Sequence, residues 1–235
     1  MAEPSTRLAL AALAACLAIG AGEPGQPPGD EAPSGVEPAA GGGDAVVYRP
    51  PRLGAPRARV GGGVRGARAL PTPLALAPDH VGLTARAAPS LFWHLDGVAS
   101  ERRGLSLVLT LIEAEGVEPL LEVPLRPPPA AGIQRVRLAD HGVGLRPDVE
   151  YEWSVSMARG AEPRVQDLVS TGYLMRVDEP RLAEPADPAR YADLGLWYDA
   201  LEGLSDAIDA RPGDAGLRAA RNALLRQAGL EAAVE

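Results

Sequence analysis

The sequence lacks several residue types that functional sites commonly need. Its 235 residues include no lysine, one cysteine, three histidines and nine aromatic residues, and the formal net charge is −8. A single cysteine excludes an intrachain disulfide framework and a cysteine-based zinc site, and three histidines disfavour a histidine-rich metal site. A negative net charge argues against general nucleic-acid binding, which requires a basic surface. We therefore expect no cofactor and no nucleic-acid partner.

Glycine and proline are concentrated near the N-terminus. Residues 22–78 hold 23 of these residues in 57 positions, and no aromatic residue precedes Tyr48. Such a segment cannot bury enough apolar area to offset the entropy lost on ordering. We expect a disordered Pro/Gly linker over residues 23–45 and a Gly/Arg-rich arm over residues 46–79.

The first residues have the pattern of an export signal. Arg7 precedes an apolar run of 13 residues, 8–20, which is too short to span a bilayer but suits the apolar region of a signal peptide. Two interpretations remain open. The segment Leu13-Ala-Ala-Cys16 resembles a bacterial lipobox, with a lipoprotein signal ending at Ala15 and lipid on Cys16. Alternatively, residues 1–22 are an ordinary signal peptide. Both predict export, to the periplasm or as a cell-envelope lipoprotein.

The arm carries a basic cluster. Between residues 45 and 78 there are six arginines and no carboxylate. Backbone amides of a glycine cluster can form an anion-binding nest, so one hypothesis is a site for a phosphate, carboxylate or sulfated glycan. The alternative, which we favour, is that the glycines permit a tight path while the arginines pair with an acidic surface. The candidate binding residues are Arg57, Arg59, Gly61, Gly62, Gly63 and Arg65.

Residues 80–180 have the alternating apolar pattern of short strands. One example is Leu105, Leu107, Leu109 and Leu111, and Pro124 predicts an edge strand. The expected strands cover residues 90–95, 104–112, 119–125, 133–138, 149–157 and 168–177. Six to seven such strands predict a mainly β fold, an antiparallel β-sandwich.

Residues 187–230 have helical spacing instead. Asp187-Pro188 is typical of a helix start, Pro212-Gly213 ends this helix, and Asp214 can cap a second one. The short connection predicts a C-terminal α-helical hairpin. We expect Trp197 and Tyr198 to be core residues that dock the hairpin on the sandwich.

One segment of the body resembles known domains. Leu145-Arg-Pro147-Asp-Val-Glu-Tyr151 resembles the Leu-x-Pro-x-x-x-Tyr segment of fibronectin type III and related immunoglobulin-like domains. In those domains a tyrosine near the start of the penultimate strand bonds back to the preceding loop. The resemblance implies an immunoglobulin-like sandwich, and it specifies fold rather than function.

A second resemblance covers about residues 46–230. Its motifs include Gly-Ala-Pro-x-x-Arg-x-Gly-Gly-Gly-x-Arg-Gly over residues 54–66, Pro89-Ser-Leu-Phe-Trp93 and Trp197-Tyr-Asp-Ala-Leu201. Together they resemble an uncharacterised bacterial family of exported proteins, mainly cyanobacterial, known as a domain of unknown function. The family brings no catalytic residues to carry over. Val64 stands where we expect threonine.

Candidate catalytic groups are few. No Gly-x-Ser-x-Gly motif is present. The pairs Asp79-His80 and Asp140-His141 could bind metal or act as acid and base. We favour a structural interpretation, with the first pair at the start of a strand and the second in a turn. Glu113, Glu115, Glu118 and Glu122 lack the spacing of a calcium loop and indicate a solvated face.

These observations favour a non-catalytic interaction module rather than an enzyme. We expect it to bind an envelope protein, acidic where the arm is involved, through a sheet edge or through the arginines of the arm. The alternative is a binding protein for an anionic small ligand or glycan. Contact with a membrane is expected only through a lipid anchor.

Overall fold

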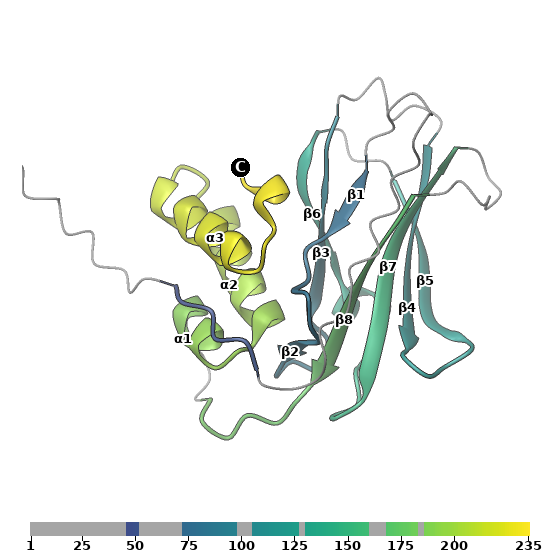
Figure 1. Cartoon of the computed structure of the whole chain (residues 1–235), viewed down its shortest axis with the longest axis horizontal. Coiled ribbons are helices and arrows are strands. Elements are labelled where there is room, and N and C mark those ends of the chain that lie inside the picture. The colour runs from purple at the N-terminus through teal and green to yellow at the C-terminus, as the bar shows by residue number, and fades with distance from the viewer. Residues whose placement is uncertain (1–45, 52–71, 98–104, 127–129, 160–167, 183–185) are drawn as a thin grey trace, which may run out of the picture. The chain divides into compact units, whose positions relative to one another are not determined.

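The described residues form two β-sheets and three α-helices (Figure 1). The computed structural model describes residues 46–51, 72–97, 105–126, 130–159, 168–182 and 186–235. The three-stranded sheet, called sheet A, has the order β1 (Pro73–Ala75), β3 (Ser90–Leu95), β6 (Gly132–Arg137). The five-stranded sheet, sheet B, has the order β2 (Gly82–Thr84), β8 (Leu168–Arg176), β7 (Glu150–Arg159), β4 (Leu105–Glu113), β5 (Pro119–Leu125). The prediction of a mainly β fold with helices near the C-terminus is confirmed.

The alternating apolar residues of β4 and β7 form the core side of sheet B. Leu107 pairs with Met157, Leu109 with Val155 and Leu111 with Trp153, and all six side chains are buried. Strand β5 pairs with β4 and ends the strand order, as Pro124 predicted. Alternation identified these strands because one face of each is buried and the other is not.

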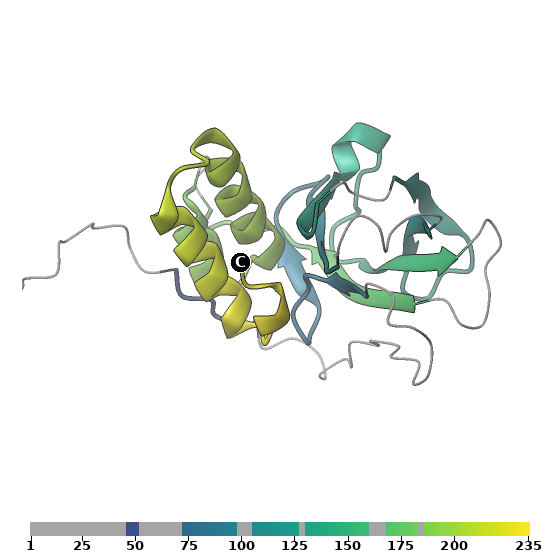
Figure 2. The same ribbon diagram turned by 90° about the horizontal axis from the view of Figure 1, so that it is seen from above.

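Strand β3 is buried along its whole length. Leu91, Trp93 and Leu95 belong to the core, while Ser90, Phe92 and His94 on the opposite face are also buried. The helices lie on the side of sheet A that faces away from sheet B (Figure 2). A strand covered on both faces loses its polar alternation.

Two strands were not predicted. Strand β1 lies within the range assigned to the arm, so the folded body begins before residue 80. Strand β2 pairs parallel with β8, which corrects the expectation of a purely antiparallel body. The chain leaves sheet A after β1 and continues in the same direction to the edge of sheet B (Figure 1). It therefore meets β8 in parallel.

Three helices replace the predicted hairpin of two. They are α1 (Pro188–Asp193), α2 (Trp197–Ala210) and α3 (Ala215–Gln227), and the short 3-10 helices are η1 (Leu138–His141) and η2 (Glu231–Ala233). The predicted caps are confirmed: Asp187 accepts a hydrogen bond from the Arg190 amide, and Asp214 accepts from two amides of α3. The break between α1 and α2 falls at Gly195, whose φ is +77°. A Cβ there would lie 2.8 Å from the Arg49 carbonyl oxygen, so glycine permits both the turn and the close approach.

Candidate functional site

The site residues predicted from the sequence lie outside the described residues. This holds for Cys16, for Arg57, Arg59 and Arg65, and for Gly61, Gly62 and Gly63. The predicted signal and linker segments, 1–22 and 23–45, lie outside them as well. The structure therefore leaves the lipobox and the anion-nest hypotheses as predictions.

Residues 46–51, at the start of the predicted arm, are bound to the helices. The Tyr48 hydroxyl lies 2.9 Å from His80 Nε2, and its ring meets that of Trp197 edge-on at 5.1 Å. The Tyr48 amide donates to Gln227 Oε1 at 2.8 Å, and Arg49 forms an ion pair with Asp193 at 2.7 Å. Burial raises the pKa of Tyr48, so its hydroxyl stays protonated. This attachment is structural, because the phenol is buried and neutral.

The other end of the predicted arm enters sheet A. Strand β1 pairs with β3, and the Ala75 amide donates to Ser170 Oγ in sheet B at 2.8 Å. The predicted arm is thus attached to the body at both ends, at the helices through Tyr48 and Arg49 and at sheet A through β1.

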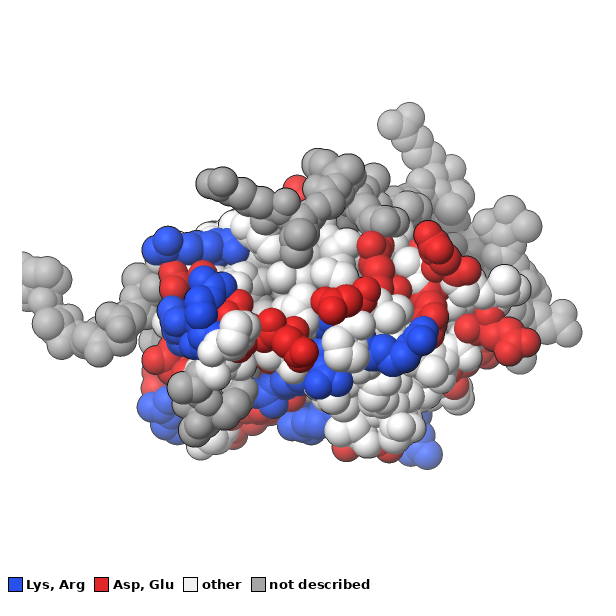
Figure 3. All heavy atoms as spheres, turned by 90° about the horizontal axis from the view of Figure 1, so that it is seen from below, with Lys and Arg blue, Asp and Glu red and all other residues white. Residues whose placement is uncertain are grey.

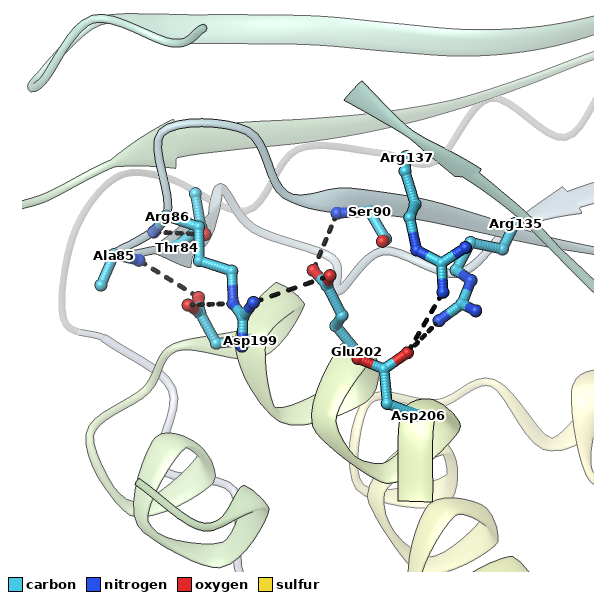
Figure 4. A network of polar contacts seen from close by, with 9 residues as sticks. All are labelled: Thr84, Ala85, Arg86, Ser90, Arg135, Arg137, Asp199, Glu202 and Asp206. Atoms are coloured by element: carbon cyan, nitrogen blue, oxygen red, sulfur yellow. Dashed lines mark hydrogen bonds and ion pairs between the residues drawn. The ribbon is translucent and has the colours of Figure 1, made fainter. Parts of the chain in front are cut away.

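A buried polar junction joins α2 to β3 and to the loop between β2 and β3 (Figure 4). Asp199 accepts a hydrogen bond from the Ala85 amide at 3.1 Å, and Glu202 accepts from the Ser90 amide at 2.9 Å. Arg86 lies between the two carboxylates, 3.4 Å from Asp199 and 3.7 Å from Glu202. Main-chain amides that would otherwise be buried without acceptors are satisfied in this way.

The same face of α2 also binds strand β6. Asp206 pairs with Arg135 at 2.5 Å and with Arg137 at 3.5 Å, and Asp209 pairs with Arg135 at 2.9 Å. This junction was not predicted, although acids at positions 199, 202, 206 and 209 have helical spacing.

The junction holds one carboxyl group that can bind a proton near neutral pH. Asp199 is fully buried, and burial raises its pKa from 3.8 to about 6. Hydrogen bonds from Thr84 and the Ala85 amide, and the charge of Arg86, act in the opposite direction. Because protein groups already surround Asp199, we assign the junction to the docking of α2.

Two further buried contacts dock the helices, as expected for Trp197 and Tyr198. Trp197 Nε1 donates to the Leu76 carbonyl oxygen at 2.9 Å. The Tyr198 hydroxyl accepts from Trp153 Nε1 and donates to the Tyr173 carbonyl oxygen, both at 2.9 Å. Both side chains are fully buried, which confirms their place in the core.

The histidines are separated in the structure. His80 Nδ1 lies 3.2 Å from Asp79, and His94 Nδ1 lies 3.5 Å from Asp96. His141 ends η1 at the surface. Within the described part of the chain, no group of three or more His, Cys, Asp or Glu residues could hold a metal ion. Nor is any helix in that part long and apolar enough to cross a membrane.

The outer face of sheet B is the remaining large feature. Residues that alternate with the core positions form a row across four strands. In this row Glu122 of β5 pairs with Thr110 of β4. Thr110 then pairs with Ser154 of β7, and Ser154 with Thr171 of β8. In the neighbouring row Val108 pairs with Ser156 and Ser156 with Val169. The face is thus built of β-branched and hydroxyl side chains, with tyrosine and glutamate at its margin. Its members are Val108, Thr110, Ile112, Ser154, Ser156, Val169 and Tyr173, with Glu122 and Glu152, while Thr171 in the same row is buried.

The β4–β5 hairpin continues this face at one end of the molecule. Val117 at its tip is 93% exposed and Leu120 is 45% exposed. An open hollow of about 520 Å³ is lined by Glu113, Gly116, Val117, Glu118, Pro119 and Leu120. Figure 3 views this end and shows acidic side chains gathered on the β4–β5 side. Val117 and Leu120 thus form a small exposed aliphatic patch beside an open hollow.

A search of the curated proteins found no match to the chain. A protein-family model does match, over residues 60–235, and its description is Domain of Unknown Function (DUF928). The match starts within the predicted arm and includes both sheets and all three helices. The chain belongs to the DUF928 family.

Proposed function

We propose that this protein is an exported cell-envelope protein that acts as a non-catalytic protein-interaction module. The observation that carries the proposal is the outer face of sheet B. Strands β4, β7 and β8 present β-branched and hydroxyl side chains there, and α2 packs mainly against β2 and β3. A surface with few charges at its centre suits a protein partner, because interface cores are depleted in charged residues.

The strand arrangement supports an immunoglobulin-like fold for the body. Sheet orders β1-β3-β6 and β2-β8-β7-β4-β5, with β2 parallel to β8, match the division of strands between the sheets of such domains. The Arg146 amide donates to the Tyr151 hydroxyl at 3.1 Å, which is the bond expected from the sequence resemblance. Sandwiches of this kind serve many unrelated binding functions, so the fold is compatible with an interaction role.

Export is proposed from the N-terminal sequence, by lipidation at Cys16 or by ordinary signal cleavage. The body would then be tethered through residues 46–51, which contact α1 and α3. Strands β4 and β5 of sheet B lie on the opposite side of the molecule from these helices, whereas β2 lies beside α2 (Figure 1). A tether at the helices would leave the outer face of sheet B directed away from the anchor.

The proposal is tested by a crosslinking pull-down from the native envelope. Val169→Arg and Ser154→Arg place a bulky charge on the outer face, and Ala219→Arg places the same charge on exposed α3. We expect a stoichiometric protein partner with wild type and Ala219→Arg, and loss of this partner with both face variants. Retention of the partner by every variant would overturn the assignment of the face.

Recovery of no partner by any bait would overturn the interaction role. The alternative would then be an anionic small ligand or glycan at Arg57, Arg59, Arg65 and Gly61–Gly63. A thermal shift on addition of phosphate or a sulfated glycan, lost in Arg59→Ala/Arg65→Ala, would support that alternative.

A further inference from the structure

The tip of the β4–β5 hairpin exposes aliphatic side chains on a well-defined turn. The Gly116 amide donates to the Glu113 carbonyl oxygen at 2.7 Å, and the Ala114 amide donates to the Glu150 carbonyl oxygen at 2.9 Å. A Cβ on Gly116 would approach the Glu113 carbonyl oxygen to 3.1 Å, so the turn packs tightly there. The exposure of Val117 is therefore a property of a hydrogen-bonded turn.

The hairpin itself carries charges of one sign. Residues 113–125 contain Glu113, Glu115, Glu118 and Glu122 and no arginine. Arg146 neutralises one of them through a 2.6 Å contact with Glu113. Glu115, Glu118 and Glu122 are exposed. An exposed aliphatic tip is thus flanked by three carboxylates.

We infer that the hairpin tip binds a basic segment of a protein partner that carries an aliphatic side chain. This inference rests on the proposed function and specifies the partner's chemistry. The aliphatic side chain fits the hollow beside Val117, Pro119 and Leu120. Arginine or lysine on either side of it would pair with Glu115 and Glu118, and such charge complementarity gives specificity and a faster association rate.

A second copy of this chain fits the tip less well. A two-fold contact brings the same patch of both subunits together. It would place Glu115 and Glu118 against their own counterparts, and like charges across an interface are unfavourable. The net charge of −8 adds to this repulsion. The surface therefore selects a basic partner.

The test uses three synthetic nine-residue peptides: one alternates Arg and Leu, one alternates Arg and Ser, and one alternates Glu and Leu. Binding to the full chain is measured by fluorescence anisotropy at several salt concentrations. We expect only the Arg/Leu peptide to bind. Val117→Asp should weaken it about tenfold, because the aliphatic contact is lost. Glu115→Gln/Glu118→Gln should weaken it and reduce its salt dependence.

Matched controls separate a local effect from a general one. Glu231→Gln removes an exposed carboxylate of η2 and should leave binding unchanged. The thermal midpoints of all tip variants should equal that of wild type, since the changed side chains are exposed. Equal binding of the Arg/Leu peptide to all variants, or equal binding of the Arg/Ser peptide, would overturn the inference. A dimer that Val117→Asp dissociates would overturn it in favour of a second copy.

The inference can fail while the proposed function holds. In the pull-down, a partner that is lost with Val169→Arg but retained with Val117→Asp would support binding at the outer face and contradict binding at the hairpin tip. Loss of the partner with both variants would support the proposed function and the inference about the tip.

Discussion

Replacing Asp199 by asparagine is expected to flatten the dependence of stability on pH between about pH 4 and pH 7. Asp199 is fully buried at the junction of α2 with the β2–β3 loop, and burial raises its pKa from 3.8 to about 6. The folded state thus holds this proton more tightly than the unfolded state. The contribution of Asp199 to stability is therefore complete below about pH 4 and is lost as the pH rises through about 6.

The size of the effect follows from the change in pKa. A rise from 3.8 to about 6 corresponds to about 3 kcal/mol between the protonated and ionised limits. In a domain of this size, that free energy corresponds to about 6–12 °C in the melting temperature. The asparagine side chain would still offer an oxygen to the Ala85 amide but could not ionise, so this part of the pH dependence should disappear.

The assay is calorimetric or circular-dichroism melting of wild type and Asp199→Asn from about pH 4.5 to about pH 8, which spans the expected change. The control is Asp206→Asn, since the Asp206 side chain is 47% exposed and lies on the same helix. We expect the melting temperature of wild type and of the control to fall more steeply with rising pH than that of Asp199→Asn. An equal fall in all three proteins would refute the reasoning that burial of Asp199 governs this pH range.

Two predictions concern the contact of sheet B with the rest of the core. Gly172→Ala should destabilise the fold by about 1–3 kcal/mol, because a Cβ there would lie 2.6 Å from Ala77 Cβ and 2.7 Å from Trp153 Nε1. Urea unfolding measures the loss of stability. The control is Gly144→Ala, because a Cβ at Gly144 would meet nothing within 4 Å. Tyr198→Phe should cost about 1–3 kcal/mol in the same assay, because it leaves the buried Trp153 N–H without its acceptor. An unchanged unfolding midpoint in either variant would contradict the claim that the corresponding contact stabilises the fold.

The longer strands were predictable from the sequence, and the shortest were not. Strands β4 and β7 run nine and ten residues, and their buried faces repeat every second residue. Strands β1 and β2 have three residues each, too few to show a period. They are fixed by distant partners, β3 and β8. The break at Gly195 likewise depends on the approach of Arg49, which local spacing does not reveal.

The surface features were only partly predictable. The acids of α2 repeat at helical spacing, but Asp199 and Glu202 bind main-chain amides more than a hundred residues away in the sequence. Asp206 and Asp209 bind arginine side chains of β6. Glu115, Glu118 and Glu122 are exposed, as predicted, while Glu113 is only partly exposed and pairs with Arg146. The significance of Glu113 and Glu118 beside Val117 and Leu120 appears only when the hairpin places them around one hollow.

The central claim, that the outer face of sheet B binds a protein partner, is tested most directly by a photo-crosslinking amino acid placed at Ser154. The same group at Ala219 of α3 is the control, and both proteins are irradiated in intact cells. We predict one discrete protein adduct from position 154 and none from position 219. Adducts from position 219 alone, or from neither position, would contradict the claim.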